Sequence, residues 1–235
     1  MPAHAIALRE SLSFISSALA PASRVLEVGC GAGQLAAALG AAGHRVVALD
    51  ANPEQVAKAR ARGVDARVAV FPEFRDDAFD AVLFTHSLHH VRDLDGAVAR
   101  ARELLRPGAV LVVEDFVWDE LALPTVAWAY AHYDAQRERL RLPPQLFRHE
   151  GDPVAAWRKH FVEHELHGAG TLRAALAKRF RVEAEAHAPY FYRFACMTLG
   201  DAQGGAAIAD ELLLAERERI SRGEIQALGW QLVLR

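Results

Sequence analysis

The first half of the chain alternates between short aliphatic runs and stretches in which apolar residues recur at helical spacing. Runs rich in valine and leucine are typical of strands that are buried on both faces of a sheet. The pattern predicts an amphipathic helix before Pro21, strands at 25–28, 45–49, 65–70, 79–84 and 109–114, and helices at 34–42, 53–62 and 93–105. Strands separated by helices favour a parallel, doubly wound sheet with right-handed crossovers. We therefore expect an α/β fold.

The second half of the chain breaks this alternation. Helical patterns with aromatic residues fill the segment after the fifth predicted strand, and strand patterns resume at 180–186 and 227–234. A long helix is expected at 206–222. The aromatic run at 190–194 has two interpretations: it closes a ligand pocket, or it is a half-buried strand, which its composition also suits. An insertion after the fifth strand emerges at the edge where open α/β sheets bind ligands. We expect a single domain over residues 1–235, with a core at 20–116, a helical cap at 117–179 and sheet completion at 180–235.

A glycine-rich turn follows the first predicted strand. The sequence RVLEVGCGAG, residues 24–33, places Gly29, Gly31 and Gly33 between this strand and the next helix. Glycines permit a tight turn and a close approach of ligand to backbone, and a helix N-terminus favours an acceptor or an anion. Asp50 ends the second predicted strand, where a carboxylate can accept both hydroxyls of a ribose. A nucleoside-containing cofactor is the leading interpretation, and a purely structural turn is the alternative.

Two positions beside the turn distinguish between cofactors. A dinucleotide-binding turn has the pattern GxGxxG, whereas Gln34 stands in place of its third glycine. Glu27, just before the first glycine, is a poor neighbour for a pyrophosphate and a good one for a cation such as an α-ammonium group. An oxidoreductase that uses a nicotinamide dinucleotide is disfavoured by both positions and stays an alternative.

These motifs resemble those of the class I S-adenosylmethionine-dependent methyltransferases that act on small molecules, the methyltransferase type 11-like group. Residues 76–91, DDAFDAVLFTHSLHHV, and 105–115, LRPGAVLVVED, are similar to the family's fourth- and fifth-strand motifs. The resemblance covers about residues 20–116. It implies a Rossmann-like sheet of seven strands with the last strand antiparallel, and methyl transfer from S-adenosylmethionine, which leaves S-adenosylhomocysteine. A protein that binds these molecules without turnover is the alternative within the family.

The resemblance also implies site residues, carried over by position. Glu27 and the glycine turn would hold the methionine part of the cofactor, and Asp50 would hold the ribose hydroxyls. Thr85 and His86 would border the sulfonium. The full implied cofactor set is Glu27, Gly29, Cys30, Gly31, Gly33, Asp50, Ala51, Phe71 and Thr85.

The sequence departs from the family pattern after the third strand. An acid there often accepts the adenine amino group, but residues 68–70 are Val-Ala-Val. Glu73 is the nearest carboxylate, late in the loop. Adenine is therefore expected against Ala51, with backbone groups and the ring of Phe71 or Phe74 around it.

His86, at the end of the fourth predicted strand, is the candidate catalytic residue. Methyl transfer is an in-line displacement, in which positioning can supply about 7–11 kcal/mol. A general base is needed only if the acceptor must lose a proton. His86 would be that base, and a pocket-lining role is the alternative. For His89 and His90 we expect a structural role that ties the loop to a neighbouring carbonyl.

Other candidate groups are weighed against simpler explanations. His160, His164 and His167 would share one helical face if their segment is helical, but there is no HExxH motif. No metal is therefore expected, and a role for one of them in facing substrate from the cap is favoured instead. Cys30 lies at a helix N-terminus, where the pKa of a thiol can be lowered, but its place in the glycine turn makes backbone contact with the cofactor the simpler role. Glu216 stands in a run of alternating acids and bases that suggests a solvated helix flank.

Composition limits the remaining function classes. The net charge of −3 and the absence of a basic patch argue against nucleic acid as a partner. No apolar run reaches membrane-spanning length. Two cysteines make no disulfide framework, which favours a cytoplasmic location. The acceptor is expected to be a small molecule, and the sequence is silent on its nucleophilic atom and on the oligomeric state.

Overall fold

The structure is a computed structural model that describes residues 1–142, 144, 146–149, 151–200 and 202–235. These residues form two compact units, each assembled from three stretches of chain. The sheet unit comprises residues 10–115, 170–186 and 230–235, and the helical unit comprises residues 1–9, 116–169 and 187–229. The chain therefore passes repeatedly between the two units.

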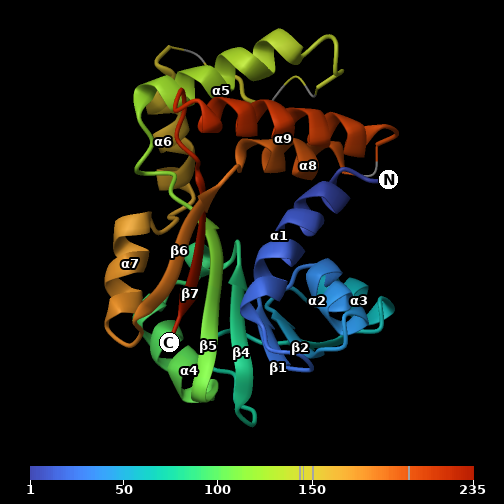
Figure 1. Ribbon diagram of the computed structural model, residues 1–235, viewed down its shortest axis with the longest axis vertical. Coiled ribbons are helices and arrows are strands. Elements are labelled where there is room, and N and C mark those ends of the chain that lie inside the picture. Colours follow the sequence, from blue (N-terminus) through green and yellow to red (C-terminus); the bar gives the residue numbers. More distant parts are fainter. Residues whose placement is uncertain (143, 145, 150, 201) are drawn as a thin grey trace. The chain divides into compact units, whose positions relative to one another are not determined.

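The sheet unit is built on a seven-stranded sheet of order β3-β2-β1-β4-β5-β7-β6 (Figure 1). The strands are β1 (Arg24–Val28), β2 (Arg45–Asp50), β3 (Asp65–Val68), β4 (Phe79–Thr85), β5 (Leu105–Phe116), β6 (Val182–Ala188) and β7 (Gly229–Leu234). Strands β1 to β5 pair in parallel. The order reverses beside β1, and such a switch point is where open α/β sheets bind ligands.

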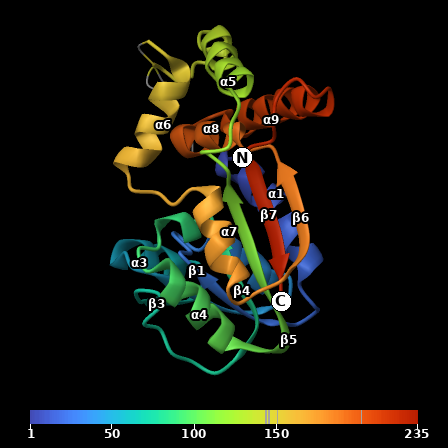
Figure 2. The same cartoon turned by 90° about the vertical axis from the view of Figure 1, so that its left-hand side faces the viewer.

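The last strand runs antiparallel to its neighbours, as predicted. Arg181 and Arg235, which flank β6 and β7, exchange backbone hydrogen bonds of 2.7 and 2.9 Å. Mutual bonds between one pair of residues are a feature of antiparallel ladders. Figure 2 shows the arrow of β7 pointing opposite to those of β5 and β6. The predicted α/β sheet of seven strands is confirmed.

Helices cover both faces of this sheet. They are α1 (His4–Ala18), α2 (Gln34–Ala41), α3 (Pro53–Ala61), the short 3-10 helix η1 (Leu88–His90), α4 (Leu94–Leu104) and α7 (Ala169–Ala177). Helices α4 and α7 lie on one face of the sheet, and α2 and α3 lie on the other (Figures 1 and 2). The side chain of Asn52 caps α3 and that of Asp93 caps α4, as expected for these residue types at helix starts.

The centre of the sheet is the apolar core of this unit. Leu26 of β1, Val82 and Leu83 of β4 and Leu111 of β5 have no exposed surface. Burying each of these side chains contributes about 1.5–3 kcal/mol. The core therefore fixes the register of the central strands and, with it, the place of the residues at their carboxyl ends.

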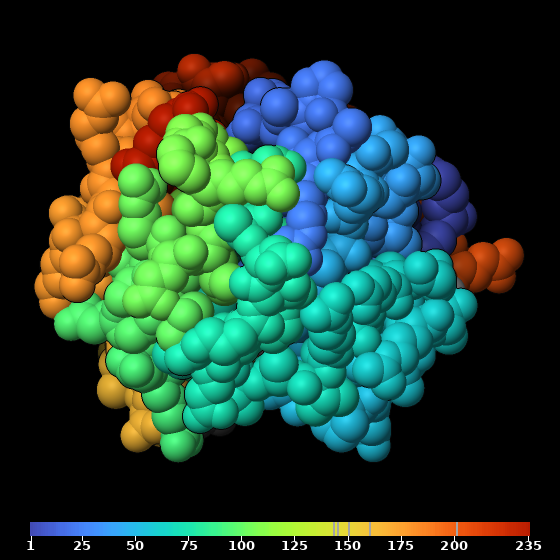
Figure 3. Space-filling view, turned by 90° about the horizontal axis from the view of Figure 1, so that it is seen from below, coloured from blue at the N-terminus to red at the C-terminus, as the bar shows by residue number. Residues whose placement is uncertain are grey.

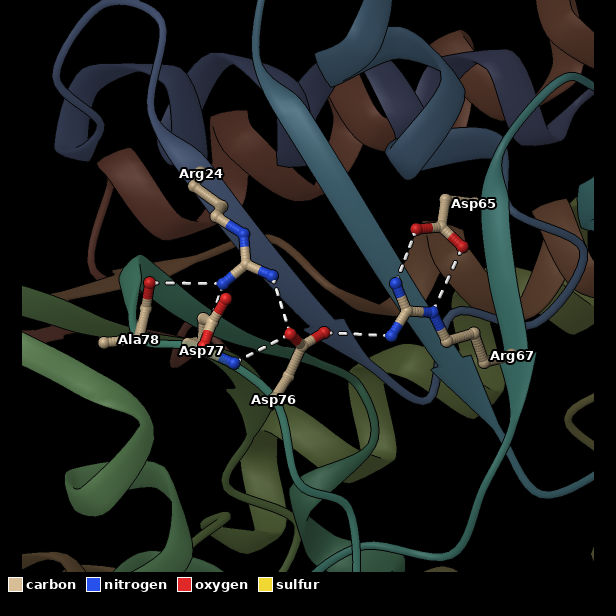
Figure 4. Close-up of polar contacts among 6 residues, drawn as sticks. All are labelled: Arg24, Asp65, Arg67, Asp76, Asp77 and Ala78. Atoms are coloured by element: carbon tan, nitrogen blue, oxygen red, sulfur yellow. Dashed lines mark hydrogen bonds and ion pairs between the residues drawn. The ribbon is translucent and has the colours of Figure 1, made fainter.

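A network of charges holds the opposite edge of the sheet, where the strands begin. Asp76 accepts hydrogen bonds of 2.9 Å from both Arg24 and Arg67, and Arg67 also pairs with Asp65 (Figure 4). Figure 3 looks onto this edge, where the chain around residues 70–80 lies beside the end of α4 and the start of β5. Because Asp76 lies in the loop between β3 and β4, the network anchors that loop.

The helical unit contains α5 (Leu123–Gln136), α6 (Pro153–Glu163), α8 (Phe191–Leu199) and α9 (Gly205–Ser221). Aromatic side chains fill its interior: the Tyr133 hydroxyl donates to the Phe191 carbonyl at 2.7 Å, and the Trp157 indole to the Trp118 carbonyl at 2.9 Å. The segment at 190–199 is helical, so the strand-like interpretation of its aromatic run is wrong. Among the described residues, no helix is long and apolar enough to cross a membrane.

Glu216 of α9 explains why this aromatic segment is helical. Its carboxylate accepts hydrogen bonds from the backbone N–H groups of Tyr190, Phe191 and Tyr192, at 2.6, 3.1 and 3.2 Å. The first N–H groups of a helix have no partner within it, and an anion there is favourable. Glu216 is 1% exposed. The prediction that it lies on a solvated flank is therefore wrong, because it caps α8 from a neighbouring helix.

Candidate active site

The glycine turn after β1 is fixed by backbone hydrogen bonds to β2. The N–H groups of Gly29 and Cys30 both donate to the Leu49 carbonyl at 2.8 Å. Gly29, Gly31 and Gly33 have φ angles of 78°, 52° and 76°, a left-handed conformation that glycine adopts without strain. The predicted turn is present, and it leads directly into α2.

The glycines of this turn differ in what surrounds them. A Cβ atom on Gly29 would lie 2.5 Å from the Ser87 Cβ, and one on Gly33 would lie 2.6 Å from the Ala59 Cβ. These two glycines therefore permit close packing of the segment after β4 and of α3. A Cβ atom on Gly31 would meet nothing within 4 Å. The turn thus combines two packing positions with one that borders open space.

Asp50 is oriented by the same turn. One carboxylate oxygen, Oδ2, accepts the Gly31 N–H at 2.8 Å, and the other, Oδ1, accepts the Asn52 N–H at 2.9 Å. A carboxylate oxygen can accept more than one hydrogen bond. Both oxygens of Asp50 are therefore held in place and keep the capacity to accept ligand hydroxyls.

Glu27 is a buried carboxyl group with an unmet hydrogen-bonding atom. It is 3% exposed, and its Oε2 has no hydrogen-bond partner in the part of the chain that the structure describes. The pKa of Glu27 is raised to about 8, mainly by burial. A backbone hydrogen bond from Ala36 opposes this rise, and the charge of Asp50 adds to it. An unsatisfied buried carboxylate is costly unless a cation or donor meets it. The site therefore fits a ligand with a positively charged donor.

A cavity of about 540 Å³ lies at the carboxyl ends of β1, β2 and β4, within the sheet unit. Four of the predicted cofactor positions line it: Gly29, Asp50, Ala51 and Phe71. Cys30, Gly31, Gly33 and Glu27 belong to the adjoining strand and turn. The sequence reasoning missed Ser87, Val91, Arg92 and Asp93, which also line it, and gave only a structural role to His90, another lining residue. The sequence feature that could have identified them is their position directly after a parallel strand, at the edge of the sheet that binds ligands.

The loop after β3 supplies one wall of the cavity, in the region for which the sequence predicted no acid. Phe71 is 8% exposed, and its ring meets that of Phe84 edge to face at 5.5 Å between centroids. Glu73 also lines the cavity, although its place in the sequence is late in the loop. A carboxylate therefore reaches this wall despite the valines at 68 and 70.

The end of β4 brings Thr85 and His86 to the same edge of the sheet. The Thr85 hydroxyl is buried without a hydrogen-bond partner among the described residues. His86 has a φ angle of 52°, and its N–H donates to the Glu114 carbonyl at 2.7 Å. The His86 Nε2 lies 3.5 Å from the Glu114 Oε2. The candidate base is thus next to a carboxylate that the sequence analysis did not single out.

His89 has a structural tie, as expected, but its partner is a side chain. Its Nδ1 lies 2.6 Å from Oδ1 of Asp115, and both side chains are almost fully buried. Because the two residues lie on different segments, the contact holds the loop after β4 against the end of β5.

The structure answers two questions that the sequence left open. The pKa of Cys30 is raised to about 12, because burial and the charges of Glu27 and Asp50 outweigh any effect of the helix N-terminus. Helix α6 ends at Glu163, so His164 is its C-cap and His167 lies beyond it. The histidines therefore do not share one helical face. Within the described ranges, no group of three or more His, Cys, Asp or Glu residues could hold a metal ion.

Comparisons with known proteins agree on one family. The family model described as a methyltransferase domain matches residues 4–187. The ubiquinone biosynthesis O-methyltransferase of Xanthomonas axonopodis pv. citri is 36% identical over 110 residues, which is 43% of this chain and 46% of that protein. The chain thus matches less than half the length of this curated relative.

Solved structures share the fold at low identity. The geranyl diphosphate C-methyltransferase of Streptomyces coelicolor A3(2) has a TM-score of 0.61 at 15% identity, over 96% of this chain and 78% of that one. The [4+2]-cyclase SpnF has a TM-score of 0.57 at 20% identity, over 96% and 80%. The cofactor that goes with the matched family is S-adenosylmethionine, whose ammonium group suits Glu27. The chain belongs to the class I S-adenosylmethionine-dependent methyltransferases.

Proposed function

We propose that this protein transfers a methyl group from S-adenosylmethionine to a small-molecule acceptor. The observation that carries the proposal is Glu27, a buried carboxyl group with an unpartnered oxygen next to the glycine turn. In a methyltransferase, this atom would receive the ammonium group of the cofactor. When bound, the cofactor supplies a methyl group on a positively charged sulfur, so the protein's main task is alignment.

The predicted cofactor residues in and beside the cavity have these roles in the proposal. Glu27 binds the ammonium group, and the backbone of the glycine turn contacts the rest of the methionine part. Asp50 accepts the ribose hydroxyls, because Gly31 and Asn52 already hold its carboxylate in place. Ala51 and Phe71 contact the adenine ring. Both line the cavity, which supports this assignment.

Glu73 is our candidate for the adenine amino group. It is the carboxylate of the β3–β4 loop that reaches the cavity lining. The amino group of adenine is a donor, and a carboxylate is an acceptor. Glu73 would thereby take the role of the acid that is missing after β3.

His86 is proposed as the group that takes a proton from the acceptor, where the acceptor must lose one. It directly follows Thr85, the last residue of β4. Residues 117–179 are proposed as the cap that selects the acceptor, because the chain leaves β5 at the ligand-binding edge. A cytoplasmic location and the absence of nucleic acid as a partner stay predictions from composition.

Calorimetric titration with S-adenosylhomocysteine tests the cofactor site. We expect binding to the wild-type protein, and about 10- to 100-fold weaker binding to Glu27→Ala and Asp50→Ala, since a charge-assisted hydrogen bond contributes about 1.5–3 kcal/mol. Glu54→Ala is the matched control, because Glu54 is an exposed acid in the first turn of α3, four residues after Asp50. Unchanged affinity in both site variants would contradict the assignment. Binding of a nicotinamide dinucleotide alone would overturn the proposal.

Turnover requires its own experiment. Because the curated relatives are named O-methyltransferases, acceptors with a hydroxyl group are the first to incubate with S-adenosylmethionine. Formation of S-adenosylhomocysteine with a product heavier by one methylene unit would support methyl transfer. Binding without any transfer across acceptor classes would favour a protein that retains the cofactor pocket for another purpose, as the fold of the cyclase neighbour permits.

A further inference from the structure

Two consecutive acids end β5 inside the sheet unit. Glu114 is 3% exposed and Asp115 has no exposed surface. Consecutive residues of a strand point to opposite faces of the sheet. Accordingly, Glu114 meets His86 and Asp115 meets His89, although both histidines come from the same segment after β4.

Glu114 is held from its other side by β7. Its Oε1 accepts a hydrogen bond of 3.2 Å from the Gln231 amide, and its Oε2 lies 3.5 Å from the His86 Nε2. A carboxylate whose two oxygens have different neighbours cannot rotate without losing one of them. Gln231 therefore fixes the direction in which Glu114 presents Oε2 to the imidazole.

The backbone fixes His86 as firmly as the side chains do. Thr85 is the register partner of Glu114, and the His86 N–H continues the ladder to the Glu114 carbonyl at 2.7 Å. The φ angle of 52° at His86 is left-handed, which is uncommon and strained outside glycine. Such strain persists only where the surrounding structure imposes it. The backbone thus holds His86 beside β5, where its imidazole faces Glu114.

Resting on the proposed function, we propose that Glu114 is a positioning residue that keeps the ring proton of neutral His86 on Nε2. Nδ1 is then the basic nitrogen. As the acceptor atom bonds to the methyl carbon, the bond between that carbon and sulfur breaks and its electron pair stays on sulfur. The acceptor proton moves to Nδ1, and Glu114 faces the imidazolium that results. A carboxylate that sets a tautomer and stabilises the cation is an established device for a general base.

The distance of 3.5 Å is longer than an ordinary hydrogen bond. Catalytic hydrogen bonds are often long in free proteins and shorten when substrate binds. The His89–Asp115 pair, at 2.6 Å, is already tight and buried. This pair therefore serves as an internal control: it is also a histidine facing a carboxylate, but its role is structural.

Nitrogen-15 NMR of the imidazole rings tests this proposal without an acceptor. Spectra are recorded on the free and the S-adenosylhomocysteine-saturated protein, as wild type, Glu114→Met and Asp115→Asn. We expect neutral His86 to carry its proton on Nε2 in the wild type, to lose this preference in Glu114→Met, and to keep it in Asp115→Asn. Asp115→Asn should change the signals of His89 instead.

A wild-type His86 with its proton on Nδ1 would overturn the proposal, and this result needs no variant to fold. The same holds if Glu114→Met folds and retains the wild-type tautomer. Calorimetry on the same samples separates the two levels. If S-adenosylhomocysteine binds and the tautomer is wrong, the positioning role fails alone; if it does not bind, the proposed function fails.

An acceptor found by the turnover screen adds a kinetic criterion. For an acceptor that loses a proton, we expect Glu114→Met to lower kcat by about 10²-fold, within the range of general-base effects, and to change KM for S-adenosylmethionine little. Gln231→Met should lower kcat less, because the carboxylate remains. Equal kcat values for Glu114→Met and wild type would contradict the role.

Discussion

Glu27 in the sheet unit and Glu216 in the helical unit are both buried carboxyl groups, and they differ in how their oxygens are satisfied. Burial raises the pKa of Glu27 to about 8 and that of Glu216 to about 7. Glu216 binds three backbone N–H groups with its two oxygens, whereas Oε2 of Glu27 has no partner in the described structure.

This difference separates a structural acid from a binding acid. The hydrogen bonds of Glu216 stabilise its own helical unit, so the group is complete without a ligand. Glu27 is costly to bury in the free protein, and a cationic ligand would offset that cost. Burial alone does not distinguish the two residues. The hydrogen-bond partners of their oxygens do: Glu216 is a structural acid and Glu27 a binding acid.

Removing Glu216 should have the largest effect. We expect Glu216→Ala to lower the free energy of unfolding by about 3 kcal/mol or more, because each buried N–H left without an acceptor costs about 1–3 kcal/mol. Urea denaturation measures this change. The exposed Glu218, on the same helix, is the matched control, and Glu218→Ala should stay within about 0.5 kcal/mol. Equal stability of the two variants would show that Glu216 is not a structural acid.

The pH dependence of cofactor binding should show the next largest effect. The ammonium group requires ionised Glu27, whose pKa in the free protein is raised to about 8. Binding therefore releases a proton below pH 8, and the affinity for S-adenosylhomocysteine should rise up to about tenfold per pH unit toward pH 8. Titration in buffers with different ionisation enthalpies detects this proton. Glu27→Gln should lack the slope; a slope that persists in this variant would refute the assignment.

Glu27 should also have a smaller effect, of opposite sign to that of Glu216, on stability. A carboxyl group whose folded pKa is raised from 4.5 to about 8 stabilises the fold fully below pH 4.5, and this contribution is lost as pH rises through 8. We expect Glu27→Gln to gain stability relative to wild type between pH 4.5 and 8, by about 1 kcal/mol or more at pH 8. Thermal unfolding across this range is the measurement. A variant that is less stable than wild type at pH 8 would show that Glu27 is structural, like Glu216.

Cys30 should show the smallest effect. Its pKa is raised to about 12, first by burial and then by Glu27 and Asp50, so little thiolate forms at neutral pH. We expect iodoacetamide at pH 8 to modify Cys30 in the folded protein far more slowly than in urea. Mass spectrometry of the labelled peptides measures both rates. Rapid labelling in the folded state would mean that the turn is more open than the comparison assumes.

The parts of the site that the sequence predicted are those encoded locally. Glu27, the glycine turn and Asp50 stand at the ends of strands whose aliphatic pattern is unambiguous, and the structure places them at one edge of the sheet. Glu114 and Asp93 belong to the same edge, yet no local pattern distinguished them from acids elsewhere. Their position depends on strand order and on the path of the loop after β4, which are set by packing.

The segment at 190–199 shows the limit of local prediction. Its aromatic residues suit a strand, and its helical state depends on Glu216, an acid more than twenty residues later in the chain. The alternating charges around Glu216 in turn suggested a solvated flank. Neither the aromatic segment nor the charged run around Glu216 predicts the other, because the stabilising interaction is the set of hydrogen bonds between them.

From the sequence by itself, hydrophobic periodicity determined a parallel α/β sheet, and the glycine turn with Asp50 indicated a nucleoside-containing cofactor. The seven strands, the antiparallel last strand and S-adenosylmethionine came from the resemblance of these local motifs to a known family. All of them depend on residues adjacent in the chain, whose meaning does not depend on distant partners. Only the tertiary structure decided what each oxygen of the buried acids meets. Both oxygens of Glu216 bind the start of α8, Oε1 of Glu114 binds Gln231, and Oε2 of Glu27 has no hydrogen-bond partner among the described residues. The physical reason is that the cost of burying a charge depends on the donors within a few ångströms, and chain folding brings those donors together from distant positions.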